Sequence, residues 1–152
     1  MGRILFNMKI RIRTRIQMLN SLVRSTFVYS CQTWSITKVQ LSRLNSQYLA
    51  FIRKMVKGGY KRKPDSWSMV YSNENLLKLA NTISLTAYIQ RQQRNYFGHI
   101  IRKDNSSIVK RLMFNSNRSR RQGRQTTLKS MVIENSTHTP DELYTKAKNR
   151  EY

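Results

Sequence analysis

Apolar residues recur along the first third of this chain at steps of three and four, which is the spacing of amphipathic helices. The alternation around Arg11 and Arg13 also fits a short edge strand. From Ile12 onward the steps become helical, so we expect a helix that reaches about Ser30. Its apolar stripe consists of Ile12, Ile16, Leu19, Val23 and Phe27.

A second apolar stripe follows Thr37 and Gln40, whose spacing is typical of a capping box. We expect this second helix to end at Gly58 and Gly59, because glycine commonly terminates helices. An exposed basic turn should follow from Tyr60 to Pro64. The stripe consists of Leu41, Leu44, Tyr48, either Phe51 or Ile52, and Met55.

A longer helix is predicted from about Ser84 to Lys103, after a short helix from about Glu74 to Ala80 that Ser72 or Asn73 would cap. Its apolar and basic residues fall on opposite faces. Because a helical glycine costs roughly 0.5–1 kcal/mol relative to alanine, Gly98 suggests that another group, such as a phosphate, approaches the backbone. The apolar face consists of Leu85, Ile89, Tyr96 and Ile100, and the basic face of Arg91, Arg94, Gly98 and Arg102.

The remaining residues are more polar. After a break at Asp104 to Ser107, one or two packed turns are expected from Ile108 to Phe114. Residues 115–127 have the composition of a mobile basic linker, and residues 128–152 that of a tail with a short, frayed helix starting at Thr139 to Glu142. We therefore predict an all-α fold, with four to five helices in a small bundle over residues 9–114 and a flexible N-terminus at residues 1–8.

The excess of basic residues in the chain bears on the kind of partner that it binds. The chain has 29 Lys and Arg against 7 Asp and Glu, a formal charge of +22, and no acidic residue precedes Asp65. Such a segment cannot neutralise itself, so we expect a polyanionic partner, with nucleic acid favoured over an anionic membrane surface. No apolar run is long enough for a membrane span or a secretory signal, and a single cysteine, Cys31, fits a reducing compartment. We expect an intracellular protein, nuclear or cytoplasmic.

Catalytic and metal-binding chemistry finds little support. Cys31, His99 and His138 lack the paired spacing of a zinc site, and no glycine-rich phosphate loop precedes a helix. His99 lies at the border of its helix faces, which favours a hydrogen bond at the core edge over catalysis, although a nuclease using His99 stays open. We expect no cofactor, no metal and no enzymatic activity of the isolated chain.

Cationic side chains on helix surfaces and turns are the candidate phosphate contacts. Aromatic residues such as Trp34 and Trp67 could stack on bases only if they are exposed, and Trp34 is interpreted as core because it ends an apolar stripe. The arginines of the linker also fit a nuclear import signal. The candidate nucleic-acid-binding residues are Arg11, Arg13, Arg15, Arg53, Lys54, Lys61, Arg62, Lys63, Arg91, Arg94, Arg102, Lys103, Arg118, Arg120, Arg121 and Arg124.

Four groups of residues, in order, resemble the region that follows the polymerase palm in reverse transcriptases of non-LTR retrotransposons. The first group is similar to that family's signature Leu-Val-x-Ser followed by Tyr-Gly-x-Glu-Thr-Trp, and the second group to its Thr-Asn-Glu-Glu-Leu-Leu motif. The third group is similar to its Gly-His-Val-x-Arg motif, and the fourth to its Arg-x-x-Gly-Arg-Pro motif. They are Leu22 to Ser25 with Val28, Tyr29, Thr33 and Trp34; Ser72 to Glu74 with Leu76 and Leu77; Gly98 to Ile100 with Arg102; and Arg121, Gly123 and Arg124.

The resemblance, over about Lys9 to Arg124, implies a helical thumb and the segment beyond it, which lie against template and primer. It also implies a role for Tyr29, Trp34, Gly98 and His99 as motif residues. The family's palm and endonuclease precede this region, so the resemblance implies a fragment that cannot polymerise alone. Ser30, Gln32 and Gln125 depart from the family's motifs at their positions. These departures suggest a decaying copy of the retrotransposon gene, or one that no longer performs the family's function. An alternative is a structural fragment that packs on a partner protein such as a polymerase palm.

Overall fold

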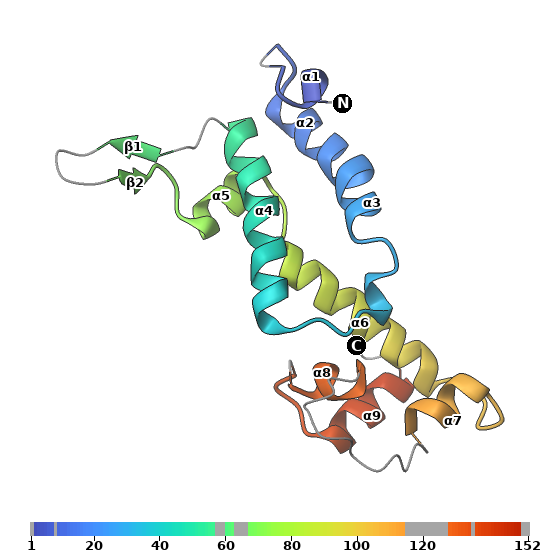
Figure 1. The fold of residues 1–152 in the computed structure, drawn as a ribbon. Coiled ribbons are helices and arrows are strands. Elements are labelled where there is room, and N and C mark those ends of the chain that lie inside the picture. Colours follow the sequence, from blue (N-terminus) through green and yellow to red (C-terminus); the bar gives the residue numbers. More distant parts are fainter. Residues whose placement is uncertain are drawn as a thin grey trace. The chain divides into compact units, whose positions relative to one another are not determined.

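The computed structural model describes residues 2–7, 9–56, 60–62, 67–114, 128–134 and 136–149. The predicted all-α fold is confirmed, with one short antiparallel hairpin, β1–β2, added to the helices (Figure 1). Contacts divide the chain into two compact units, unit 1 (residues 1–29 and 38–88) and unit 2 (residues 30–37 and 89–152). This division differs from the predicted one, which placed residues 9–114 in one domain. Each unit is described by itself.

Unit 1 begins with the short α1 and then a helical run that changes its winding on the way. The predicted helix over residues 12–30 is confirmed, but it ends at Phe27, and Ser30 adopts a left-handed conformation with φ 59°. The later elements are the predicted α4 and α5, the hairpin and the first turn of α6. The elements are α1 Gly2–Leu5, α2 Ile12–Met18, the π-helical η1 Leu19–Arg24, α3 Ser25–Phe27, α4 Lys38–Val56, β1 Tyr60–Arg62, β2 Trp67–Met69, α5 Asn73–Leu79 and α6 Leu85–Ile101.

The π-helical winding of η1 was not predicted from the sequence. Hydroxyl groups in and after this segment bond back to backbone carbonyls: Ser21 Oγ donates to the carbonyl oxygen of Gln17 at 2.9 Å, and Thr26 Oγ1 to that of Leu22 at 2.8 Å. Ser25 Oγ donates likewise to the carbonyl of Ser21. Such bonds compete with the regular helical ladder and bend or loosen it. A hydroxyl-rich stretch is therefore where the winding changes.

The core of unit 1 lies between the α2–η1 run, α4, α5 and the start of α6. Between the two residues that the spacing left open, Ile52 is buried and Phe51 is 44% exposed. Polar groups join the same elements, because the Tyr48 hydroxyl donates to Asn20 Oδ1 at 2.8 Å and Asn45 Oδ1 accepts from the backbone N–H of Leu85 at 3.0 Å. The core residues are Ile16, Leu19, Tyr48, Leu49, Ile52, Met55, Leu76, Ala80 and Leu85.

Two local predictions in unit 1 have different outcomes. The cap of α5 is confirmed as Ser72, whose Oγ accepts from the backbone N–H of Asn75 at 3.2 Å. The exposed turn predicted from Tyr60 to Pro64 is wrong in its first part, because Tyr60–Arg62 forms β1 and pairs with β2, placing Lys61 opposite Ser68. Three-residue strands are too short for a two-residue period to reveal them. The predicted end at Gly58 and Gly59 lies outside the described residues.

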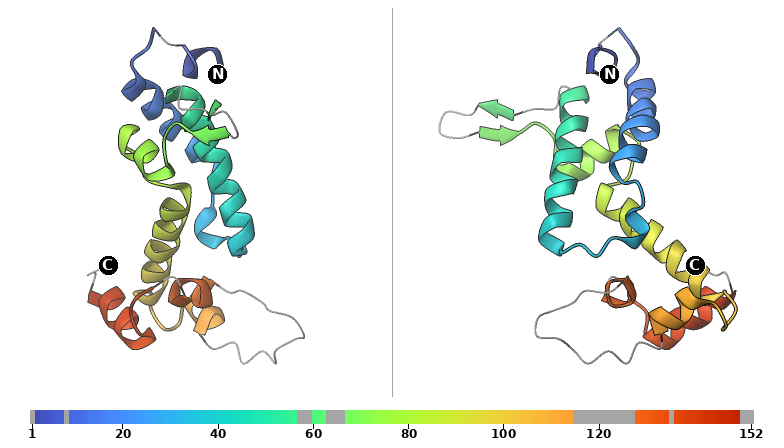
Figure 2. Two further views of the ribbon diagram at one scale, coloured as in Figure 1. Left: turned by 90° about the vertical axis from the view of Figure 1, so that its left-hand side faces the viewer. Right: turned by 45° about the vertical axis from the view of Figure 1, so that its right-hand side comes forward.

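Unit 2 is built on α6 from Ile89 onward. Helices α7, α8 and α9 gather around the C-terminal half of α6 (Figure 2). One cluster joins them, consisting of Phe97, Ile101, Val132 and Ala147, with Met113, Phe114 and Tyr144 packed against it. The further elements are η2 Cys31–Thr33, α7 Ile108–Phe114, α8 Leu128–Glu134 and α9 Pro140–Asn149.

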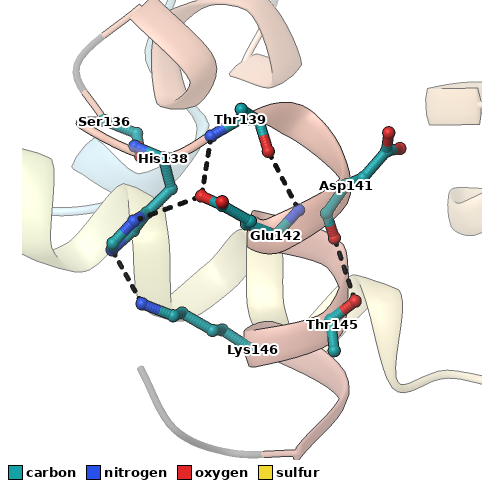
Figure 3. Close-up of polar contacts among 7 residues, drawn as sticks. All are labelled: Ser136, His138, Thr139, Asp141, Glu142, Thr145 and Lys146. Carbon is teal, nitrogen blue, oxygen red and sulfur yellow. Dashed lines mark hydrogen bonds and ion pairs between the residues drawn. The ribbon is translucent and has the colours of Figure 1, made fainter.

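The prediction of a frayed C-terminal helix is wrong. Leu143 is 2% exposed and Ala147 is fully buried, so α9 belongs to the core of unit 2. The start of α9 is as predicted and forms a complete capping box (Figure 3). The Thr139 N–H donates to Glu142 Oε2 at 3.2 Å, and the Glu142 N–H donates to Thr139 Oγ1 at 3.4 Å. Two buried positions four residues apart were too few to reveal an amphipathic helix.

A polar chain extends from this cap. Glu142 Oε2 lies 3.6 Å from His138 Nδ1, and Lys146 Nζ lies 3.1 Å from His138 Nε2 (Figure 3). An ammonium group has no lone pair, so Lys146 donates and Nε2 accepts. The proton of a neutral imidazole then sits on Nδ1, facing the carboxylate. Glu142 thus takes part both in the capping box and in the series of side-chain contacts with His138 and Lys146.

Helix α7 is confirmed over the predicted residues, but it is packed on one side only. Met113 and Phe114 contact the unit 2 cluster. Ile108, Val109 and Leu112 are 71%, 41% and 64% exposed. Among the described helices, none combines the length and the apolar character needed to cross a membrane.

We predict that Phe97→Ala destabilises unit 2 by about 3–5 kcal/mol, because it empties the centre of the shared cluster. Leu112→Ala on exposed α7 is the matched control and should cost less than about 1 kcal/mol. Urea unfolding followed by circular dichroism measures both. Equal losses for the two variants would mean that α8 and α9 do not pack on α6.

We predict that Thr139→Ala costs about 1 kcal/mol, because it leaves the N–H of Glu142 without its side-chain acceptor. Thr137→Ala is the control, since Thr137 is exposed and lies outside the capping box. Thermal melts of the two variants give the comparison. A melt of Thr139→Ala indistinguishable from that of the control would contradict the cap.

Candidate nucleic-acid interface

The longest helix of unit 1 presents a cationic surface without acidic residues. Helix α4 contains no Asp or Glu. Arg43, Gln47, Ala50 and Lys54 are all exposed and follow one another at steps of four, three and four, so they form one outward face. Lys54 Nζ lies 4.5 Å from the centroid of the Phe6 ring, within the range of a cation–π contact. This face offers spaced positive charges and an amide.

At the start of α2, Arg11 and Arg13 are exposed, as a phosphate contact requires. Two other predicted contacts in unit 1 instead hold the fold together. Arg15 is only 3% exposed, and its Nη1 donates to the carbonyl oxygen of Met55 at 3.1 Å. Arg53 is half-buried and donates to Asn73 Oδ1. The burial of Arg15 argues against a phosphate contact by this residue, whereas the contact predicted for Arg53 stays a prediction.

Arg15 has a physical reason to be where it is. Met55 lies in the last turn of α4, whose carbonyls lack partners within the helix and carry the negative end of its dipole. A buried cation needs such a partner, and the sequence before Asp65 offers no carboxylate. The C-terminus of α4 therefore supplies the negative partner of the buried guanidinium, which in most proteins is an Asp or Glu carboxylate.

In unit 2, α6 also contains no Asp or Glu. Its exposed strip consists of Arg91, Asn95, His99 and Arg102. Arg94 is half-buried beside the strip, and Lys103 is exposed just beyond the end of the helix. Of the four predicted cations, two thus lie on the strip, one lies exposed beyond it, and one is half-buried.

Gly98 and His99 lie elsewhere on α6 than predicted, since Gly98 was expected on the basic face and His99 at the border of the two faces. His99 is exposed on the strip and is not at a core edge. Gly98 is buried, and a Cβ atom there would lie 3.1 Å from Arg102 Nη1 and 3.9 Å from the Cβ of Ala147. The group nearest to this glycine is therefore the Arg102 guanidinium, and Ala147 of α9 is in ordinary contact. The apolar face likewise includes Phe97 where Tyr96 was predicted, since Phe97 is fully buried and Tyr96 is half-buried.

Arg102 combines exposure with a structural contact. Its Nη1 donates to the carbonyl oxygen of Ala147, in the last turn of α9, at 2.7 Å. Lys110 is held in a similar way, because its Nζ donates to the carbonyl oxygen of Lys103 just past the end of α6 at 2.8 Å. Both cations neutralise helix C-termini, and the outward part of Arg102 stays accessible.

A buried amide that sequence reasoning missed holds the segment before α4. Gln93 is 2% exposed, and its Nε2 lies 3.1 Å from the carbonyl oxygen of Trp34 and 3.5 Å from that of Cys31. Burial raises the pKa of the Cys31 thiol, an effect that a backbone hydrogen bond partly offsets. Trp34, predicted as core, is half-buried, and Tyr29 is 81% exposed. The sequence signal for this contact was the position of Gln93, a polar residue, on the apolar stripe of its helix.

A second cationic group, in unit 2, was not predicted from the sequence. Four cations line a cavity of about 1000 Å³ beside the rings of Phe114 and Tyr144. The signal was weak because half of the group lies in the segment predicted to be a frayed tail. The cations are Lys110, Arg111, Lys129 and Lys148.

The other predicted contacts lie partly or wholly outside the described residues. Lys61 and Arg62 belong to β1, and only their backbone is described. Within the described part of the chain, no group of three or more His, Cys, Asp or Glu side chains could hold a metal ion. The residues outside are Lys63, Arg118, Arg120, Arg121 and Arg124.

Comparison with protein-family models, with characterised proteins and with solved structures finds no match for this chain. The assignment of a function therefore rests on the residues and their geometry.

We predict that the Cys31 thiol of the folded chain reacts with iodoacetamide at pH 8 at least about tenfold more slowly than in urea, because it is buried and its pKa is raised. Gln93→Leu should speed the reaction, since the Cys31 and Trp34 carbonyls lose their amide donor. Gln92→Leu, on the same helix, is the control. Equal labelling rates in the two variants would show that Gln93 does not hold this segment.

Proposed function

We propose that this chain binds duplex nucleic acid through its sugar-phosphate backbone and carries out no chemistry of its own. The observation that carries the proposal is that α4 and α6, the two longest helices, contain no acidic residue and present Arg43, Lys54, Arg91 and Arg102 outward. Phosphate contacts need cations spaced on rigid surfaces and no base-reading pattern. An intracellular location, nuclear or cytoplasmic, corresponds to this role.

The resemblance to non-LTR retrotransposon reverse transcriptases supports the same proposal. A thumb contacts the sugar-phosphate backbones of template and primer, and basic helix faces can supply these contacts. Of the motif residues, Gly98 is buried and the backbone carbonyl of Trp34 accepts a hydrogen bond from Gln93. Tyr29 and His99 are exposed. We infer that the chain derives from the thumb and post-thumb region of such an enzyme.

The first experiment is a salt titration of binding to RNA, DNA and hybrid duplexes. If about six to eight phosphates are neutralised, the logarithm of the association constant should fall against the logarithm of salt concentration with a slope of about −5 to −7. The measurement is fluorescence anisotropy of a labelled duplex. A slope of this plot near zero would contradict the proposed binding to phosphates.

A second prediction concerns the strip on α6. Arg91→Gln should weaken binding to every duplex sequence by a similar factor and flatten the salt slope by about 1, because one phosphate contact is lost. Asn95→Ser, one turn along the same strip, leaves the charge intact and is the matched control. Loss confined to particular sequences would instead identify Arg91 as a base contact.

A partner protein is the second candidate, and the apolar outward face of α7 favours it. Ile108, Val109 and Leu112 share that face and are all exposed. A polymerase palm or another protein could cover it. A cooperative thermal melt of the isolated chain would count against a partner that completes the fold.

A further inference from the structure

The cavity of unit 2 combines features that the duplex-binding surfaces lack. It has a volume of about 1000 Å³ and is lined from the C-terminal end of α6, the turn after it, and α7, α8 and α9. This volume is at the upper end of the range of roughly 300–1,000 Å³ for pockets that take small molecules. Figure 2 shows these helices converging around the end of α6. The cavity is thus formed within one compact unit.

Two aromatic rings form one side of the cavity. Phe114 and Tyr144 have ring centroids 5.3 Å apart, and each packs edge-on against Phe97 with centroids 6.1 Å apart. Because Phe97 is fully buried, it fixes the two rings from behind, while both line the cavity in front. Rigid aromatic surfaces of this kind are where nucleic-acid bases stack.

Cations surround the aromatic side. Lys110, Arg111, Lys129 and Lys148 all line the cavity, and none of the described residues around it contributes a carboxylate. Lys129 Nζ lies over the Phe114 ring, 5.2 Å from its centroid, which places a positive charge directly beside this aromatic side chain.

The charge of Lys110 is partly balanced by Asp104, which lies in the turn after α6. Hydrogen bonds from Ser106 chiefly lower the pKa of Asp104, and the positive charge of Lys110 lowers it further. The other three cations remain available to an anion. The position of Lys129, beside the Phe114 ring, would let one ligand contact both a ring and an ammonium group.

Neutral polar groups complete the lining. Asn105 and Asn149 each bring an amide, which can both donate and accept hydrogen bonds. Thr145 Oγ1 donates to the carbonyl oxygen of Asp141 at 3.0 Å, which leaves its lone pairs as acceptors. A ligand with an aromatic ring, hydrogen-bonding edges and a phosphate matches rings, amides and cations together.

We propose that this cavity binds one unpaired nucleotide, with its base against Phe114 and Tyr144 and its phosphate among Arg111, Lys129 and Lys148. This inference rests on the proposed function, because the nucleotide would come from a strand that the basic helix faces already hold. A base that stays stacked within a duplex has no free face to lay on these rings. The cavity would therefore recognise a strand end or an unpaired position, and a free nucleotide is the other source of the same chemistry.

The test uses the full chain and a short duplex that carries one unpaired 2-aminopurine nucleotide at its 3′ end. We expect it to bind about tenfold more tightly than the blunt duplex, because stacking of one base is gained. The fluorescence of 2-aminopurine should fall on binding as the base stacks on the rings. Adenosine monophosphate is added as competitor in a separate arm.

Three variants separate the cavity from the rest of the surface. Arg111→Gln with Lys148→Gln, both at exposed positions, and separately Tyr144→Leu should abolish the preference for the unpaired nucleotide. Lys9→Gln with Lys78→Gln removes the same charge from exposed sites of unit 1 and should weaken both duplexes equally. Circular dichroism melts establish that Tyr144→Leu is folded, and the double variant tests the cavity without altering its rings.

The outcomes distinguish the two proposals. Preserved salt-dependent binding to both duplexes without any preference would overturn the cavity and leave duplex binding intact. Binding of adenosine monophosphate itself, measured directly by calorimetry and lost in the cavity variants, would assign the site to a free nucleotide, even if neither duplex binds. Absence of binding to duplex, overhang and adenosine monophosphate would overturn both.

Discussion

The contact between cationic side chains and helix C-termini is the interaction on which this structure depends. A chain with 29 cations and 7 acidic residues cannot neutralise its interior with carboxylates. Arg15 instead donates to the last turn of α4, Arg102 to the last turn of α9, and Lys110 to the carbonyl that follows α6. Unsatisfied carbonyls and the negative end of the helix dipole supply the partner. The fold is thus consistent with a composition that would otherwise oppose compactness.

This arrangement divides the cations by role. Those that serve helix ends are buried or tied to a carbonyl, whereas Arg43, Lys54 and Arg91 stand on outward faces of helices without acids. Sequence position alone could not make the division, because Arg13 and Arg15 are two residues apart and only Arg15 is buried. Surplus charge that the fold does not use is what a phosphate backbone would neutralise.

Periodicity foresaw the helices that bury a long stripe and missed elements held by few residues. Helices α4, α5, α6 and α7 lie where the spacing of Leu, Ile and Tyr residues placed them. The packing of α9 was not predicted because its buried residues, Leu143 and Ala147, with the half-buried Tyr144, form too short an apolar stripe. Gly98 was predicted on the outward basic face, but it is buried between the Arg102 guanidinium and α9, which was taken for a tail. The outward charges of the site follow from helix spacing, whereas the cavity depends on tertiary contacts that no local pattern encodes.

The most direct test of the account is arginine footprinting with a phenylglyoxal reagent, read by mass spectrometry with and without duplex. The account predicts that Arg43 and Arg91 react in the free chain and become protected by duplex, because they stand on exposed helix faces. Arg15, which is 3% exposed, should stay unreactive in both states. Rapid modification of Arg15, or unchanged reactivity of Arg43 and Arg91 in the presence of duplex, would contradict the division of roles on which the proposed function rests.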